Sequence, residues 1–163
     1  MTDDVFPDRD MEHADKIDWL LEEHGWVAEP VAPVEGPEPR PGYTYTVGFA
    51  SHFGRPEVVI FGLTPVAARG LLGMVADQHA GGVELPVGTF VGLLENDLPC
   101  ALLPVALEEW AGLFPDDERV HGTGAYEMLQ FVWPDRGGRL PWDEGYEERL
   151  RLAQPVIGAL PTP

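Results

Sequence analysis

The sequence has one cysteine, Cys100, among its 163 residues. A single thiol cannot form a disulfide within the chain, and it cannot build a metal site with several thiolate ligands. Cys100 follows Leu98-Pro99 and begins an apolar run, a setting more typical of a buried and inert thiol than of a nucleophile paired with His52 or His121. We therefore expect a structural cysteine and a reducing, cytoplasmic location.

Long apolar runs are also missing. No run approaches the about 20 residues that cross a bilayer, and Met1 to Asp4 lacks the basic and apolar regions of an export signal. Met1 to Asp8 has little apolar surface to bury, so we expect residues 1–9 to be flexible and removable without loss of the fold. Neither export nor membrane insertion is predicted.

Basic residues are scarce: Lys and Arg total 10 against 28 Asp and Glu, which gives a net charge of −18. This charge opposes binding to nucleic acid or to an anionic membrane surface. The charge is uneven, because residues 1–29 hold ten acids and two bases. Such an acidic segment favours solubility, or it forms a face for a basic protein partner.

Two classes of motif are absent. The glycine pairs at 81–82 and 137–138 form neither a P-loop nor a dinucleotide fingerprint. His52 and Glu57, with His79 or His121, offer nitrogen and oxygen ligands, but no His-x-x-x-His or His-Glu-x-x-His spacing occurs. We predict no nucleotide site and no metal site from sequence.

The length suits one domain, residues 1–163, and the apolar pattern divides it into helices and strands. Asp10 is placed to cap a helix that Gly25 ends, and residues 29–42 form a loop with five prolines, which cannot support a regular ladder. Thr64-Pro65 predicts the start of a second helix, to His79. Strands are expected at 43–49, 58–61, 87–94, 100–107 and 126–133, with a turn at 95–97, an irregular segment at 108–124 and one helical turn around 146–152.

These elements predict a single α+β domain with a curved, mostly antiparallel sheet of five to seven strands. The helix from Thr64 should pack on the sheet, with the N-terminal helix outside it. The order of strands and helix is similar to that of split-barrel flavin-binding proteins. The sequence leaves the cofactor unknown, and flavin is suggested by this fold analogy alone.

Functional side chains gather in two segments. Residues 50–57, between the first two strands, contain His52 and Glu57 as candidate acid and base groups and Arg55 as a ligand-binding charge. Trp133, Asp135 and Trp142 surround a glycine-containing loop that could close on a planar ligand. If the strand ends point the same way, both segments rim one mouth of the sheet.

Two interpretations stay open for these residues. We favour a small-molecule site, catalytic or not; the alternative is an acidic interaction or immunity-type protein without catalysis. For the second segment, a structural role is at least as well supported, with tryptophan rings covering the end of the sheet and Asp135 capping a turn.

Several motifs resemble, in order and spacing, the bacterial family catalogued as domain of unknown function 4262. They are Tyr45-Thr46-Val47-Gly48-Phe49, Arg55-Pro56-Glu57, Phe61-Gly62-Leu63, Gln130-Phe131-Val132-Trp133-Pro134-Asp135, Pro141-Trp142 and Gln154-Pro155. The resemblance covers Trp26 to Ile157 and implies a small cytoplasmic protein. It assigns no reaction, and Phe49 and Arg55 differ from the residues common in the family.

Overall fold

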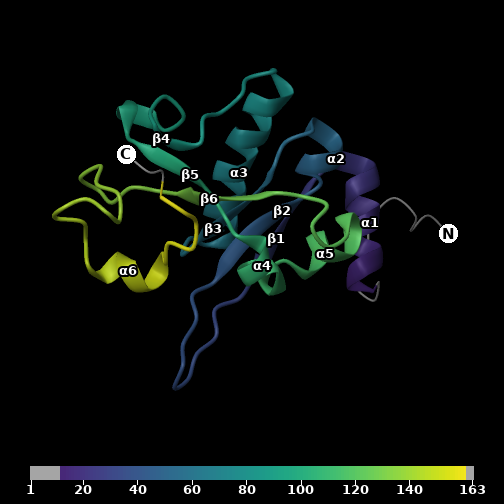
Figure 1. The fold of residues 1–163 in the computed structure, drawn as a ribbon, viewed down its shortest axis with the longest axis horizontal. Helices are drawn as coiled ribbons and strands as arrows, with labels where there is room; N and C mark the ends of the chain where they lie inside the picture. The colour runs from purple at the N-terminus through teal and green to yellow at the C-terminus, as the bar shows by residue number, and fades with distance from the viewer. Residues whose placement is uncertain (1–11, 161–163) are drawn as a thin grey trace.

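The computed structural model describes residues 12–160. Its centre is a six-stranded sheet in the order β1-β2-β3-β6-β5-β4 (Figure 1). All neighbours are antiparallel except β3 and β6, which run parallel. The strands are β1 (Val27–Val31), β2 (Tyr43–Val47), β3 (Glu57–Phe61), β4 (Gly88–Phe90), β5 (Cys100–Pro104) and β6 (Met128–Val132).

Helices cover both faces of this sheet. They are α1 (His13–His24), α2 (Phe49–Phe53), α3 (Pro65–Ala80), α4 (Leu107–Trp110), α5 (Pro115–His121) and α6 (Arg149–Ala153), with 3-10 turns at Glu95–Asp97 and Ala111–Leu113. The expected single α+β domain is confirmed. The sheet is open and does not close into a barrel, so it departs from the split-barrel arrangement.

The two faces of β3 explain the layers. All five residues of this central strand are buried, as expected for a strand covered on both sides. Val58 and Ile60 join the core under α3, whereas Val59 and Phe61 join the core that includes Ile17 of α1. Side chains two positions apart on a strand lie on the same face of the sheet. Glu57 therefore lies on the face of Val59, which α1 and α5 cover.

The predicted helix at Thr64 is confirmed. Thr64 Oγ1 accepts a hydrogen bond from the backbone N–H of Ala67, and Pro65 occupies the first turn. The first helix ends as expected at Gly25, which adopts a φ of +84°. Its predicted cap, Asp10, and the segment 1–9 lie outside the described residues.

The proline-rich segment differs in part from its prediction. The strand β1 continues through Pro30 to Val31, so the prediction of a loop from residue 29 was wrong for these residues. Pro30 is tolerated because β1 lies at the edge of the sheet. Beyond it, the chain forms a long hairpin closed by a bridge between Val34 and Arg40.

The segment 108–124 was predicted to be irregular, and this prediction was wrong. It folds into α4, a 3-10 turn and α5. Pro115 at the first helical position and three acids in the first turn are ordinary helix-start signals. No helix within residues 12–160 is long and apolar enough to cross a membrane.

Candidate functional site

Glu57 is a fully buried carboxylate at the start of β3. The short helix α2 follows β2 after Gly48, whose φ is +112°, and turns its first N–H groups toward Glu57. Gly48 and Ala50 donate to Oε2, and Phe49 and the Thr46 hydroxyl donate to Oε1, at 2.7–3.1 Å. This set of donors stabilises an ionised carboxylate inside the protein.

His121, the last residue of α5, also contacts Glu57. Its Nε2 lies 2.8 Å from Glu57 Oε2 and 3.4 Å from Asp117 Oδ1. Asp117 is fully buried, and neither of its oxygens accepts a hydrogen bond from residues 12–160. We call Glu57, Asp117 and His121 the buried triad.

The pKa values of the triad follow from these contacts. Interaction with Asp117 and with Glu57 raises the pKa of His121 to about 9, because both neighbours favour a protonated ring. Burial raises the pKa of Asp117. The triad is therefore a place where protons are held more tightly than in the unfolded chain.

A second cluster lies next to the triad. His13 Nε2 lies 3.3 Å from Glu29 Oε1 and 3.2 Å from Asp116 Oδ2, and Asp116 also accepts a hydrogen bond from the buried Tyr45 hydroxyl. In each cluster, the three possible ligand atoms lie within 4.8 Å of one another. The His13 side chain is 57% exposed, so this cluster opens to solvent.

The two predicted segments do not meet. β3 and β6 run parallel with Glu57 opposite Met128, so residues 50–57 precede one end of this pair. Trp133 follows the other end of β6, roughly 16 Å away along the strand. The expectation that both segments rim one mouth of the sheet was wrong. It assumed that β2 and β6, the strands that the two segments follow, end at the same edge, but these two strands run in opposite directions.

Of the first predicted segment, only Glu57 belongs to the triad. His52 is exposed on α2, its ring 4.6 Å from that of Phe53 between centroids. The ring also covers Gly25, where an added Cβ would lie 2.5 Å from it. Arg55 forms an ion pair with Glu84 at 3.5 Å.

In the second segment, Asp135 organises the loop that follows β6. Its carboxylate accepts hydrogen bonds from the backbone N–H groups of Gly137, Arg139 and Glu147 and from Arg139 Nε. Burial acts to raise the pKa of Asp135, but these donors lower it below its usual value. These bonds hold together the loop that leads to α6.

Trp133 and Gln154 attach the C-terminal segment to the sheet. The Gln154 amide accepts from the backbone N–H of Trp133 and donates to its carbonyl oxygen. The indole Nε1 of Trp133 donates to the carbonyl oxygen of Phe61. Trp142 is half-buried against a small core that includes Leu140. The geometry of these residues suits a structural role for the segment.

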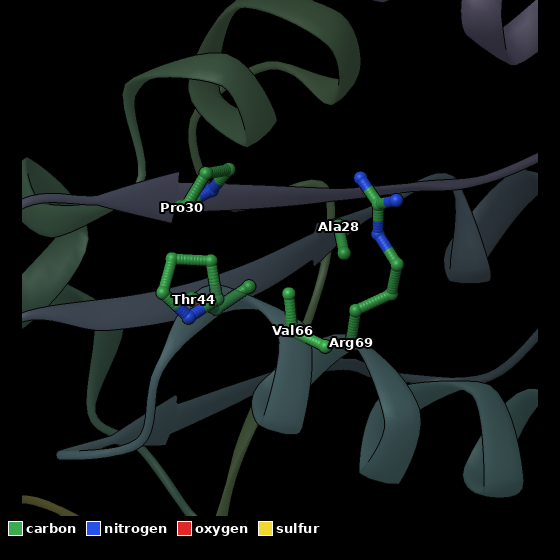
Figure 2. Close-up of a pocket in the computed structure, with 6 residues that line it drawn as sticks. Ala28, Pro30, Thr44, Val66 and Arg69 are labelled. Atoms are coloured by element: carbon green, nitrogen blue, oxygen red, sulfur yellow. The ribbon is translucent and has the colours of Figure 1, made fainter.

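A surface channel, absent from the sequence interpretation, runs between β1 and α3. The part with the largest volume of the three, about 710 Å³, lies between the proline-rich hairpin, the start of α3 and α6. It adjoins at Pro65 a hollow of about 190 Å³ lined by Ala28, Thr44 and Val66. Figure 2 shows Arg69 of α3 reaching toward the strand of Ala28. A third part, about 400 Å³, shares Ala28 and Arg69 and extends to the end of α1. We call these parts the α3 channel.

Sequence reasoning missed Asp117, and it considered His121 with Glu57 only as part of a metal site that it rejected, because α5 was not predicted. Spaced four residues apart, Asp117 and His121 share one helical face, so the helix-start signal at Pro115 would have paired them. Their meeting with Glu57 depends on long-range packing. No local pattern in the sequence predicts the channel, since its walls come from a hairpin, two helices and a strand that are distant in the chain.

Comparison with known proteins gives one match. A family model described as a domain of unknown function, DUF4262, matches residues 20–147, most of the chain and most of the span of the sequence resemblance. No curated protein and no solved structure matches. The match includes the whole sheet and the buried triad. The chain belongs to the DUF4262 family.

Proposed function

We propose that this protein binds a small, largely apolar molecule with a negatively charged group in the α3 channel. The observation that carries the proposal is the charge of the channel on a strongly acidic protein. Arg40, Arg69 and Arg149 line it, and Glu35 is the one carboxylate that lines it in the described part of the chain. The whole chain has 10 basic and 28 acidic residues.

The arginines are available for a ligand to different degrees. Arg40 and Arg69 form no ion pair with residues 12–160, whereas Arg149 pairs with Glu147 at 2.9 Å. A guanidinium binds carboxylate, sulfonate or phosphate oxygens with two parallel hydrogen bonds. Arg40 and Arg69, which are not paired within residues 12–160, locally offset the repulsion that the net charge exerts on an anion.

Exposed apolar side chains line the same channel. Val34, Val66 and Leu152 are 53, 83 and 86% exposed and come from the hairpin, α3 and α6. Concave sites for small molecules combine such surface with a few placed polar groups. The channel therefore offers burial to an apolar body and ion pairing to its charged end.

The second predicted segment supports this channel indirectly. Asp135 holds the loop leading to α6, and Gln154, next to Ala153, attaches this helix to Trp133. Ala153 and Leu152 form one wall of the channel. Trp133 and Asp135 are thus positioning residues for the proposed site.

Two dyes test the proposal. The anionic dye 8-anilinonaphthalene-1-sulfonate should bind one per chain, with enhanced fluorescence, and the neutral N-phenyl-1-naphthylamine should bind the same place. Arg69→Gln and Arg149→Gln should each weaken the sulfonate by about 3- to 10-fold and leave the neutral dye unchanged. Arg136→Gln, an exposed arginine outside the channel, is the matched control.

Leu152→Glu should weaken both dyes, because it places a carboxylate on an apolar wall. Equal sulfonate affinity in the Arg69→Gln, Arg149→Gln and Arg136→Gln proteins would contradict the proposal. So would dye binding that Leu152→Glu leaves unchanged.

A further inference from the structure

Asp117 is a buried carboxylate to which no group of the described residues donates a hydrogen bond. Its side chain is 0% exposed, and neither oxygen accepts a hydrogen bond from residues 12–160. Buried polar groups in native proteins nearly always have a partner, and a buried carboxylate without one is costly. Oδ1 lies 3.4 Å from His121 Nε2, so this carboxylate faces the ring of His121.

The three possible ligand atoms of the triad lie within 4.8 Å of one another, close enough to be drawn to one cation. Nε2 of His121 lies 2.8 Å from Glu57 Oε2 and 3.4 Å from Asp117 Oδ1. Nitrogen and oxygen ligands lie about 2.1 Å from a transition metal, which puts neighbouring ligands about 3.0–3.4 Å apart in octahedral or tetrahedral geometry. Small side-chain shifts would bring all three atoms to one ion.

Charge favours the same occupant. Once Asp117 is ionised and His121 has lost its proton, the two carboxylates carry two negative charges, which one divalent cation beside the neutral imidazole balances. We propose that Glu57, Asp117 and His121 bind one divalent transition-metal cation. One nitrogen and two carboxylate oxygens suit Zn²⁺, Mn²⁺, Fe²⁺ or Co²⁺.

The surroundings of the triad already orient these ligands. Thr46 and three backbone N–H groups of residues 48–50 fix the Glu57 carboxylate, as outer-shell donors do in metal sites. The ring of Tyr126 lies against His121 with centroids 5.5 Å apart. On binding, the proton on Nε2 leaves and the contact with Glu57 gives way to bonds to the cation.

The metal proposal is independent of the α3 channel. Glu57 has the same parity on β3 as Val59, which joins the core on the opposite side of the sheet from α3. None of the triad residues lines the channel. Failure of metal binding therefore leaves the dye experiment unaffected, and the reverse also holds.

The test titrates chelator-treated protein with Zn²⁺, Mn²⁺ and Co²⁺. We expect one cation per chain by calorimetry, and a Co²⁺ absorption spectrum that reports nitrogen and oxygen ligands. Asp117→Asn and His121→Gln should each weaken binding by at least about 100-fold. His13→Gln is the matched control, because it disrupts the neighbouring cluster and leaves the triad intact.

A readout on the wild-type protein guards against variants that fail to fold. Substoichiometric Mn²⁺ should broaden the amide NMR signals of residues 48–50 and of α5 before all others. Absence of stoichiometric binding for all three cations would overturn the proposal. Binding that is lost in His13→Gln but kept in Asp117→Asn would overturn it as well, by assigning the cation to the neighbouring cluster.

Discussion

His121 Nε2 lies 2.8 Å from Glu57 Oε2, although 64 positions separate the two residues in the chain. This contact joins the end of α5 to the start of β3. The start of α2 binds the Glu57 carboxylate locally, and α5 adds His121 and Asp117 to it. The result is a site with three ionisable groups. Several measurable properties of the protein depend on it.

The stability of the metal-free protein should fall as pH rises from about 6.5 to about 9. Contacts with Asp117 and Glu57 raise the pKa of His121 from 6.5 to about 9, so the folded protein holds a proton that the unfolded chain releases in this interval. The raised pKa of Asp117 acts in the same direction. Urea unfolding at pH 6.0 and 9.5 measures the difference.

In His121→Gln, the free energy of unfolding should change clearly less between about pH 6.5 and 9 than it does in the wild type. A wild-type free energy of unfolding that is constant or rises between these pH values would contradict the assignment of the proton to His121.

Glu57→Gln should destabilise the protein by about 3–5 kcal/mol, the cost of breaking a buried charged contact. The new amide NH₂ would face N–H donors of residues 48–50 and could not accept from them. Glu127→Gln, at an exposed neighbouring site, is the control and should change stability by less than about 0.5 kcal/mol. Equal stability of the two variants would show that the buried carboxylate has no structural role.

Gln154→Ala should cost about 1–3 kcal/mol, because it leaves buried partners unsatisfied at Trp133 and at the Tyr146 hydroxyl. It should also weaken sulfonate dye binding, since α6 forms a wall of the α3 channel. Thermal unfolding and the dye titration, run on the same protein, check both effects. Unchanged dye affinity alongside lower stability would separate Gln154 from the channel.

Cys100 should be unreactive toward thiol reagents in the native protein and reactive after unfolding. Its side chain is fully buried, and burial raises the pKa of the thiol to about 12. Cys100→Val should fold and bind the dyes as the wild type does. Native labelling as fast as labelling in urea would contradict this account.

Much of the fold could be predicted from local patterns. The strand pair at Tyr43 and Val58, the cap at Thr64 and the end of the first helix at Gly25 were all readable, because each depends on neighbours in sequence. Burial of Cys100 followed from its apolar context. The resemblance to DUF4262 is confirmed by the family match.

The candidate sites depended on packing that sequence does not encode locally. The segment 108–124 was predicted to be irregular, yet it contains α5, on which Asp116 and Asp117 are buried. The parallel pairing of β3 with β6 placed Trp133 far from Glu57, and an antiparallel pairing would have brought them together. His52 and His121 are equally plausible by sequence, and only the position of α5 selects His121.

The central claim, a binding site for a small apolar anion in the α3 channel, is tested most directly by ¹H–¹⁵N NMR. Titration with 8-anilinonaphthalene-1-sulfonate should shift the amide signals of Val66, Arg69 and Leu152 together, with one dissociation constant. Signals of α5, on the other face of the sheet, should stay in place. Shifts confined to α5, or spread evenly over the surface, would contradict the account.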